Sequence, residues 1–418
     1  MSAIHIIGGK KLEGSICLQG SKNAALPILA AALLTEGVCV LEHCPHIADV
    51  NAMLEILRDL GAKVWTEGEK LCIMAPEILN AHIDAKHIIS MRSSIILLGV
   101  LLAENGFVSM EYPGGCVIGE RPIDMHILGL QKMGCIFEND AKVLHAHVKR
   151  LQGAKIFLKF PSVGATENII LAAVKAKGAT VICGAAKEPE IVHLCNFLNG
   201  CGAKIKGAGT NCIYIEGVSN LCGCRFTIPS DRIVAGTYLM SALATKGRIS
   251  IENAPVAELE AVLCVLRKMG AGIEENDAVL TGILEGTLRA VDVETRVYPG
   301  FPTDLQSPML VLLTQAGGCG SVQENIYENR FRIVSELEKM NAKIKLDGNK
   351  VLTYGVSNLT AAKVRAKELR GNAALIMAGL LAEGETVVSD CQYVKRGYED
   401  ICRDLENLGA MIYENEEE

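Results

Sequence analysis

The residues best suited to chemistry lie in one glycine-rich loop, residues 112–126. The loop reads Tyr112-Pro-Gly-Gly-Cys-Val-Ile-Gly-Glu-Arg-Pro-Ile-Asp-Met-His126. Its glycines permit positive φ and mobility, and Cys116 shares the loop with Arg121. A cationic neighbour lowers the pKa of a thiol, and the thiolate is the nucleophilic form of cysteine. Cys116 is therefore the candidate nucleophile or proton donor, whereas we expect the other cysteines to be small apolar residues of strands and helices.

Basic and capping residues recur in the short loops that precede apolar helices. Helix amino termini expose unpaired N–H groups and so bind phosphates. A basic residue has the wrong sign there unless an anion sits opposite, which predicts an anion site. Simple capping of the helices is the alternative for any single loop. The loops are Ser21-Lys22-Asn23, Met91-Arg92-Ser93, Ser162-Val163-Gly164, Ser230-Asp231-Arg232, Pro302-Thr303-Asp304 and Arg370-Gly371-Asn372.

These loops recur because the chain repeats itself. A helix end followed by a strand start, as in Leu60-Gly-Ala-Lys-Val64, returns every 68–73 residues, with markers at Gly61, Gly134, Gly202, Gly270, Asn341 and Gly409. Repeats decide the architecture. In each repeat an apolar helix ends at a glycine that suits a left-handed turn, as at Gly37 or in Lys246-Gly247. A strand, a polar loop, an amphipathic helix and further strands follow, and this alternation predicts an α/β fold.

The two ends of the chain together make one repeat. The first twenty residues resemble the last part of a repeat, and the sixth repeat stops after Met411-Ile-Tyr413. We therefore expect the amino terminus to complete the sixth repeat in space. This predicts one domain over 22–229 and a second over 230–418 with 1–21 added, joined by two linkers that leave a cleft able to open and close.

Size and composition narrow the class of protein. A chain of 418 residues, half of them hydrophobic, is expected to form two domains. Its longest apolar runs, 24–34 and 95–103, are shorter than the roughly 20 residues needed to span a bilayer. Sixteen cysteines without a Cys-x-x-Cys pair, and no signal sequence, indicate a reducing cytoplasm. The net charge of −7 argues against a nucleic-acid partner.

In its order and spacing of motifs, essentially the whole chain resembles the UDP-N-acetylglucosamine 1-carboxyvinyltransferase family of enolpyruvyl transferases. The resemblance implies an α/β (α+β) fold, a two-domain inverse α/β barrel in which each domain has three βαβαββ repeats with inward helices. The motifs are Gly20–Pro27, Pro113–Asp124, Ser162–Thr166, Glu188–Ile191, Phe301–Asp304, Glu328–Phe331 and Arg396–Tyr398.

The resemblance also implies a reaction. The enolpyruvyl group of phosphoenolpyruvate moves to the 3′-hydroxyl of UDP-N-acetylglucosamine by addition and elimination, phosphate leaves, and peptidoglycan precursor synthesis begins. Cys116 is implied as the proton donor and as the thiol that fosfomycin alkylates, Asp304 as the base, and Lys22 and Arg396 as further catalytic residues. No cofactor or metal is implied, and the oligomeric state is left open. The implied substrate-binding residues are Lys22, Asn23, Arg92, Arg121, Pro122, Ile123, Asp124, Met125, Ser162, Val163, Gly164, Asp304, Ile326, Arg330, Arg370 and Arg396.

Three positions depart from the pattern of the family. Lys159-Phe160-Pro161 precedes Ser162 where a basic residue is common, Glu368 stands where Asp is usual, and Ala48 precedes Asp49. These changes concern uridine contacts and stabilisation of the intermediate, and they indicate one of two paralogues.

Other interpretations remain open at this point. His126 either assists at the diphosphate or is a satisfied polar residue of a helix. The segment His43-Cys44-Pro45-His46 has potential metal ligands, but no fourth ligand stands at a recognisable spacing and zinc usually takes four. The sister enolpyruvylshikimate-phosphate synthases lack a catalytic cysteine in such a loop. A non-catalytic sugar-nucleotide-binding paralogue is the alternative from a different class.

Overall fold

A computed structural model describes residues 2–75, 78, 80–112, 119, 121–140, 143–355 and 358–416. The chain forms two compact units. Unit 1 comprises residues 1–19, 117–120 and 230–418, and unit 2 comprises residues 20–116 and 121–229. Cys116, the candidate nucleophile, lies outside the described residues, so its role stays a prediction.

The described part of unit 2 has three four-stranded sheets with the same internal order. In each sheet the first strand runs parallel to the second, and the remaining pairs are antiparallel. Strand β14 comes from the end of this stretch of chain and completes the sheet of the first repeat. The sheets are β14 (Arg225–Thr227), β3 (Cys39–Glu42), β5 (Lys70–Met74), β4 (Lys63–Glu67); β6 (His82–Ile83), β7 (Phe107–Glu111), β9 (Val143–His147), β8 (Ile136–Asp140); and β10 (Lys155–Phe157), β11 (Ala179–Cys183), β13 (Cys212–Glu216), β12 (Lys204–Lys206).

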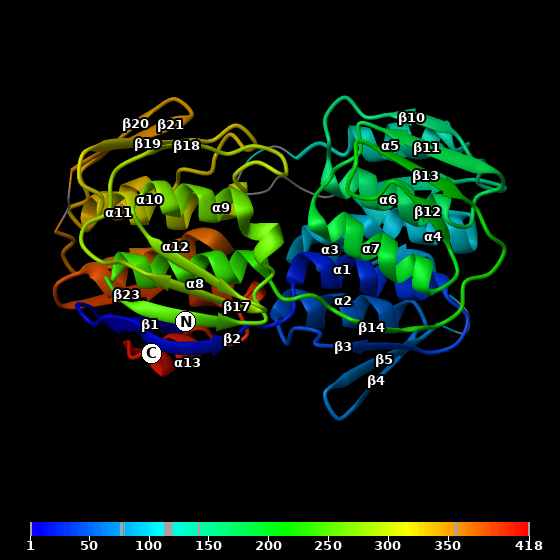
Figure 1. The fold of residues 1–418 in the computed structure, drawn as a ribbon. Coiled ribbons are helices and arrows are strands. Elements are labelled where there is room, and N and C mark those ends of the chain that lie inside the picture. Colours follow the sequence, from blue (N-terminus) through cyan, green and yellow to red (C-terminus); the bar gives the residue numbers. More distant parts are fainter. Residues whose placement is uncertain are drawn as a thin grey trace. The chain divides into compact units, whose positions relative to one another are not determined.

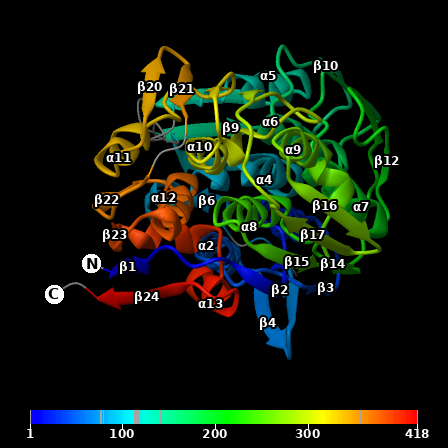
Figure 2. The same cartoon turned by 60° about the vertical axis from the view of Figure 1, so that its left-hand side comes forward.

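Unit 1 has the same arrangement in its described residues, and the amino terminus supplies two of its strands. Strand β1 lies between β23 and β24, antiparallel to both, and β2 runs parallel to β15. Figure 2 shows β1 and β24 side by side. The sheets are β2 (Glu13–Cys17), β15 (Arg248–Glu252), β17 (Val279–Ile283), β16 (Gly272–Asn276); β18 (Asp292–Glu294), β19 (Cys319–Gln323), β21 (Lys350–Tyr354), β20 (Ile344–Asp347); and β22 (Lys363–Arg365), β23 (Glu385–Ser389), β1 (Ser2–Ile7), β24 (Met411–Glu416).

Each unit encloses apolar helices within its sheets (Figure 1). A helix that is apolar on every side is stable only when it is buried all round. In unit 1 every residue of α8 (Arg232–Ala244) is buried, as is every residue of α10 (Gln306–Thr314). The third enclosed helix of unit 1 is α12 (Leu369–Leu381), and those of unit 2 are α1 (Lys22–Ala31), α4 (Leu97–Asn105) and α6 (Val163–Ala173).

The remaining helices alternate with strands along the chain. In unit 2 they are α2 (Ala48–Asp59), α3 (Ala85–Ser90), α5 (Asp124–Lys132) and α7 (Pro189–Gly200), with 3₁₀ turns η1 (Ala32–Leu34) and η2 (Arg92–Ile96). In unit 1 they are α9 (Val256–Lys268), α11 (Val334–Lys339) and α13 (Ile401–Asn407), with η3 (Thr303–Leu305) and η4 (Cys391–Arg396). The predicted α/β class with inward helices is therefore confirmed. No helix in the described ranges is long and apolar enough to cross a membrane.

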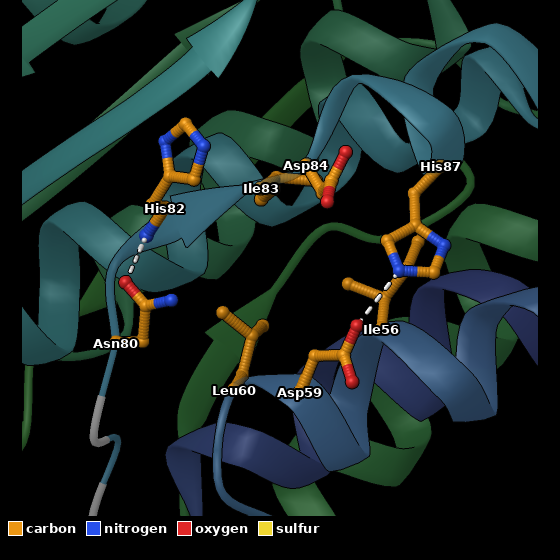
Figure 3. A pocket seen from close by; sticks show the side chains of 8 residues that line it. All are labelled: Ile56, Asp59, Leu60, Asn80, His82, Ile83, Asp84 and His87. Carbon is orange, nitrogen blue, oxygen red and sulfur yellow. Dashed lines mark hydrogen bonds and ion pairs between the residues drawn. The ribbon is translucent and has the colours of Figure 1, made fainter.

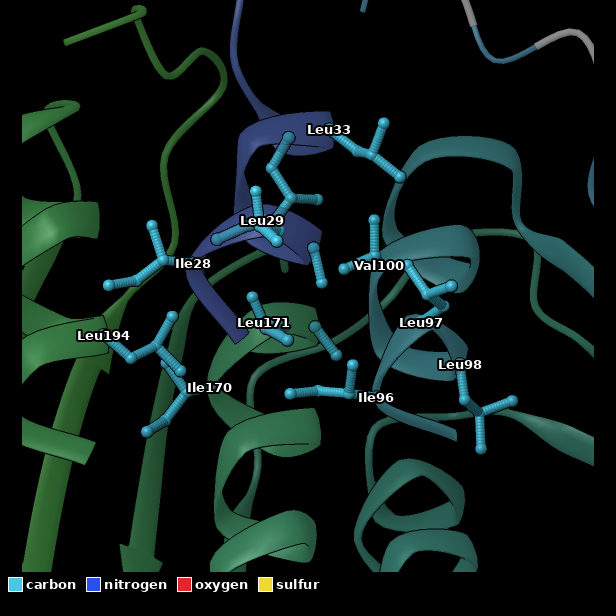
Figure 4. Packing of buried hydrophobic residues seen from close by; sticks show 14 of the residues in the cluster. Ile28, Leu29, Leu33, Ile96, Leu97, Leu98, Val100, Ile170, Leu171 and Leu194 are labelled. Carbon is cyan, nitrogen blue, oxygen red and sulfur yellow. The ribbon is translucent and has the colours of Figure 1, made fainter. Parts of the chain in front are cut away.

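The core of unit 2 forms where its enclosed helices meet. Figure 4 shows Leu29 of α1, Leu97 of α4 and Leu171 of α6 among the packed side chains. All three residues are fully buried. Burying a leucine side chain stabilises a fold by roughly 1.5–3 kcal/mol, so these helices hold their polar first turns in fixed positions.

One predicted turn is placed differently. After α8 the left-handed residue is Lys246, with φ 56°, and not Gly247. A Cβ on Gly247 would collide with the backbone of Leu12, because β15 begins beside the chain that enters β2. Glycine is required there for close approach of two backbones, not for a left-handed turn.

Candidate active site

A carboxylate clamped by two arginines is the most distinctive polar feature of unit 1. Asp304 Oδ1 accepts a hydrogen bond from Arg330 Nη2 at 2.8 Å. Asp304 Oδ2 accepts two from Arg370, from Nε at 3.1 Å and Nη2 at 2.7 Å. The side chains of Arg330 and Arg370 are only 3% and 5% exposed, whereas that of Asp304 is 27% exposed. The carboxylate is thus the part of the cluster that a ligand can reach.

The clamp fixes the charge of Asp304. Burial alone would raise the pKa of this carboxyl, but the positive charges and hydrogen bonds of Arg370 and Arg330 hold it well below its usual range. Asp304 is therefore ionised throughout the physiological range. Because a low pKa also makes a weak base, the two arginines must loosen their hold for Asp304 to accept a proton readily.

A second buried carboxylate holds the backbone around Asp304. Glu324, which is 3% exposed, follows strand β19. Its Oε1 accepts hydrogen bonds from Thr295 Oγ1 at 2.9 Å and from the backbone N–H groups of Ile326 and Tyr327 at 2.8 and 3.1 Å. Its Oε2 accepts one from Thr303 Oγ1 at 2.9 Å. Glu324 therefore ties the turn that carries Asp304 to the loop that carries Ile326.

The clamp also depends on the amino terminus of α12. Glu368 is the N-cap of this helix, and its carboxylate accepts hydrogen bonds from the backbone N–H of Arg370 at 2.8 Å and of Gly371. The longer side chain at this position, where the family pattern has Asp, therefore still caps the helix. Within the described ranges, Arg370 Nη1 and Arg330 Nε are buried and lack a hydrogen-bond acceptor. Buried donors without an acceptor are uncommon in folded proteins.

Arg396 lies in the same unit as the clamp. It is the last residue of the turn η4, which packs against α12, and its side chain is half-buried. Two residues later Tyr398, which is 1% exposed, donates from its hydroxyl to Thr237 Oγ1 at 2.9 Å. The segment that carries Arg396 is therefore anchored by a buried tyrosine.

Unit 2 brings together several of the other predicted residues. Arg92, at the start of η2, donates through its Nη2 to the backbone carbonyl of Arg121. Residues 121–125 lead into α5 directly after this contact, with Arg121, Pro122 and Asp124 exposed and Ile123 buried. This contact brings the Arg92 guanidinium group to the backbone of Arg121, and the positive charges of both arginines act on His126.

His126 connects this stretch to the start of α6. Asn168 Oδ1 accepts from the Gly99 N–H at 2.7 Å, so its Nδ2 donates to Ile95 O at 2.9 Å and to His126 Nδ1 at 2.8 Å. His126 Nδ1 is therefore an acceptor, and the neutral ring carries its proton on Nε2. Burial, followed by the charges of Arg121 and Arg92, lowers the pKa of His126 to about 4.

The N–H side of the His126 ring faces the predicted diphosphate loop. A Cβ built on Gly164 would lie 3.1 Å from His126 Cε1 and 3.4 Å from Nε2. Ser162 is the N-cap of α6, and its side chain accepts from the Ala165 N–H at 3.3 Å. Residues 162–164 thus present a helix amino terminus beside a neutral imidazole donor. His126 is thus a buried helix residue bonded to Asn168, and its role at the diphosphate stays a prediction.

Lys22 already has an anion opposite it. Its Nζ lies 2.6 Å from Asp49 Oδ2, and both side chains are largely buried, at 12% and 5% exposure. Asp49 stands in the first turn of α2 and Lys22 opens α1, next to Asn23. The anions expected opposite the basic helix starts therefore include protein carboxylates, Asp49 for Lys22 and Asp304 for Arg370.

Two residues that hold the site together in the structure were not predicted from the sequence. Glu324 and Asn168 are buried polar groups whose hydrogen bonds bind separate segments together. Asn168 could have been noticed as an amide within the apolar helix segment Asn168-Ile-Ile-Leu-Ala172, because buried amides are normally hydrogen-bonded. Glu324 carried no comparable signal.

A separate hollow in unit 2 does not involve the predicted residues. Its volume is about 250 Å³, and it is lined by Ile56, Asp59, Leu60, Asn80, His82, Ile83, Asp84 and His87 (Figure 3). His87 Nε2 lies 2.9 Å from Asp59 Oδ2, and this hydrogen bond lowers the pKa of the Asp59 carboxyl. The side chains of His87 and Asp59 are thus hydrogen-bonded to each other at this end of the hollow.

His43, one of the possible metal ligands, has a hydrogen-bond partner in the backbone. His43 Nδ1 lies 3.0 Å from the carbonyl oxygen of Ile228. Over the described ranges no group of three or more His, Cys, Asp and Glu side chains is arranged to hold a metal ion.

Comparison with known proteins identifies the class. Residues 6–405 match the family model of EPSP synthase (3-phosphoshikimate 1-carboxyvinyltransferase). The chain is similar in fold to the enolpyruvyl transferase NikO from Streptomyces tendae, with a TM-score of 0.90 at 23% identity over 99% of each chain. It is also similar to EPSP synthase from Acinetobacter baumannii, with a TM-score of 0.77 at 18% identity over 100% of each chain. These likenesses show the two-domain inverse α/β barrel fold.

Curated relatives narrow the class further. The chain is 45% identical over 415 residues to UDP-N-acetylglucosamine 1-carboxyvinyltransferase 2 of Carboxydothermus hydrogenoformans, covering 99% of both chains. It is 46% identical over 412 residues to UDP-N-acetylglucosamine 1-carboxyvinyltransferase of Halothermothrix orenii, again covering 99% of both. The chain therefore belongs to the enolpyruvyl transferase family, among the UDP-N-acetylglucosamine 1-carboxyvinyltransferases.

Proposed function

We propose that this enzyme transfers the enolpyruvyl group of phosphoenolpyruvate to the 3′-hydroxyl of UDP-N-acetylglucosamine and releases phosphate. The relatives that are 45–46% identical over nearly the whole chain carry this activity in their names. The observation that carries the proposal is the ionised Asp304 carboxylate, held by two arginines in a family of enolpyruvyl transferases.

The addition step requires a proton on the methylene carbon of phosphoenolpyruvate and removal of the proton from the sugar hydroxyl. We assign the first role to Cys116, as the resemblance implies, and the second to Asp304. The hydroxyl oxygen then bonds to C2 and gives a tetrahedral intermediate. Loss of a proton from the methyl group formed in the first step, together with loss of phosphate from C2, restores the double bond, so atoms and charge balance over the two steps.

The clamp on Asp304 gives the base a means of activation. Guanidinium groups bind phosphates and carboxylates through paired hydrogen bonds. Arg330 and Arg370 are almost fully buried, so phosphoenolpyruvate can reach them only if they turn from Asp304. An anion that draws Arg330 or Arg370 away from Asp304 would raise the pKa of the carboxyl towards its usual value. The base would then be strengthened only when the donor substrate is bound.

Residues of unit 2 are assigned to the sugar nucleotide, as the resemblance implies. The helix start at Ser162, Val163 and Gly164, with the His126 N–H beside it, suits the diphosphate. Asn23 and residues 121–125, namely Arg121, Pro122, Ile123, Asp124 and Met125, are assigned to the remainder of the same ligand. Lys22, Arg92 and Arg396 supply positive charge for phosphoenolpyruvate.

The proposed reaction takes place in the cytoplasm. It is the first committed step of peptidoglycan precursor synthesis. A phosphate-release assay with both substrates tests it. Release that requires both phosphoenolpyruvate and UDP-N-acetylglucosamine is expected. Binding of the sugar nucleotide without release would instead indicate a non-catalytic paralogue, and release with shikimate 3-phosphate as acceptor would indicate the sister activity.

A further inference from the structure

Two cysteines face each other across the outer surface of a sheet in unit 2. Cys183 ends β11 and Cys212 begins β13, and the two residues are direct partners in the antiparallel register. Burial alternates along both strands, with Ile182 and Ile213 on the buried face. Cys212 is exposed and Cys183 is half-buried, so both thiols lie on the solvent side of the sheet.

The backbone hydrogen bonds define what kind of pair this is. The carbonyl of Cys183 accepts from the Leu158 N–H at 2.9 Å, beyond the end of β10, and so points away from β13. The next residue, Gly184, donates to Asn211 O at 2.8 Å. Cys183 and Cys212 therefore form a non-hydrogen-bonded pair, the type whose Cα atoms lie about 4.5 Å apart with their side chains closest.

That geometry is compatible with a disulfide, which accepts Cα separations of about 4.4–6.8 Å. The two thiols already interact, since Cys183 raises the pKa of the Cys212 thiol after the effect of burial, and Lys155 acts in the opposite sense. No task in the transfer reaction is assigned to either residue, and neither is needed for the apolar core.

We propose that Cys183 and Cys212 form a thiol–disulfide exchange site that accepts a low-molecular-weight disulfide. The thiolate of the exposed Cys212 attacks one sulfur of that disulfide and releases one thiol. The thiolate of Cys183 then attacks the Cys212 sulfur and releases the second thiol. The protein loses two hydrogen atoms and gains one S–S bond, and the small disulfide is reduced to two thiols. A reducing dithiol reverses both steps.

The chain contains two comparisons for this site. Cys319 is also exposed on a strand, but its antiparallel partner is Tyr354. Cys201 and Cys224 have their Sγ atoms 3.3 Å apart, but Cys201 is 2% exposed, so a polar disulfide reaches it poorly. Cys319 is therefore exposed but has no thiol opposite it, whereas Cys201 has a neighbouring thiol but is buried.

The test is incubation of the full chain with oxidised glutathione, followed by peptide mapping without reduction. We expect a cross-linked peptide that joins residues 183 and 212, reversed by dithiothreitol, while Cys319 keeps glutathione as a mixed disulfide. In Cys183→Ser the cross-link should be lost entirely and Cys212 should keep glutathione. Thermal melting of Cys183→Ser and of the unaltered chain, both in the reduced state, shows whether the fold is retained.

Two results would contradict the proposed exchange site. One is Cys212 holding glutathione in the unaltered chain to the same extent as Cys319. The other is a cross-link between residues 201 and 224 in place of 183 and 212. Because the readout is a mass and not turnover, the outcome is independent of the proposed transferase function.

Discussion

Arg370 donates two hydrogen bonds to the same oxygen of Asp304, from Nε at 3.1 Å and from Nη2 at 2.7 Å. With Arg330 on the other oxygen, both carboxylate oxygens of Asp304 accept hydrogen bonds from a guanidinium group. A carboxylate held in this way stays negatively charged and is only a weak proton acceptor. Catalysis is therefore expected to depend on the two arginines as much as on the carboxylate.

Replacing Arg370 by lysine tests this dependence. Lysine keeps the charge but cannot reproduce the planar fork that grips the Asp304 oxygen. We expect kcat of Arg370→Lys to fall about 10²-fold, the order found when one positioned transition-state donor is lost. Steady-state kinetics measure it, with the exposed Arg365→Lys on β22 as the control that should behave as the unaltered enzyme. Equal kcat values for the two variants would refute the role of the clamp.

Glu324 is expected to position Asp304 without touching substrate. Glu324→Ala removes four acceptor interactions that hold residues 303, 295 and 326–327, so kcat should fall about tenfold or more while KM for phosphoenolpyruvate changes less. Glu324→Gln keeps an acceptor oxygen for the backbone N–H groups and should recover most of the activity. If Glu324→Gln were as impaired as Glu324→Ala, the negative charge and not the positioning would matter.

His126 should make stability depend on pH. The folded pKa of about 4 lies below the ordinary 6.5, so the unfolded chain binds a proton first as pH falls. The contribution of neutral His126 to the free energy of unfolding is complete above pH 6.5 and is lost as pH falls towards about 4. Between about pH 7.5 and about pH 5, the free energy of unfolding of the unaltered enzyme should fall by about 2 kcal/mol more than that of His126→Gln.

Denaturant unfolding at several pH values measures the effect of His126. The exposed His46→Gln serves as the control and should follow the unaltered protein across the same range. A His126→Gln curve parallel to that of the unaltered protein would mean that His126 is protonated as easily in the fold as in the unfolded chain.

Cys116 is expected to carry the reactive thiol. Cys116→Ser should slow turnover by about 10²-fold or more, the usual contribution of a proton-transfer group, and should abolish labelling by fosfomycin. Binding of UDP-N-acetylglucosamine, followed by calorimetry, should remain. Cys264→Ser, which alters an exposed cysteine of α9, should change neither property. Labelling that persists in Cys116→Ser would move the assignment to another thiol.

The repeat pattern predicted the fold class because each repeat carries its own local signals. Glycine markers and apolar helices depend on neighbours in the chain, so they can be read without a structure. The partners of Asp304 could not be read in this way, since Arg330 and Arg370 lie 26 and 66 residues away in the sequence. The same holds for Lys22 and Asp49, which sit on different helices. Only the fold reveals that the basic helix starts are partly neutralised by protein carboxylates.

Release of phosphate from phosphoenolpyruvate in the presence of UDP-N-acetylglucosamine is the most direct test of the central claim. The enzyme should release phosphate only when both substrates are present, and Asp304→Asn, checked for retained folding by thermal melting, should reduce the rate by about 10²–10⁴-fold. A rate in Asp304→Asn equal to that of the unaltered enzyme, or no release at all from the unaltered enzyme, would contradict the account.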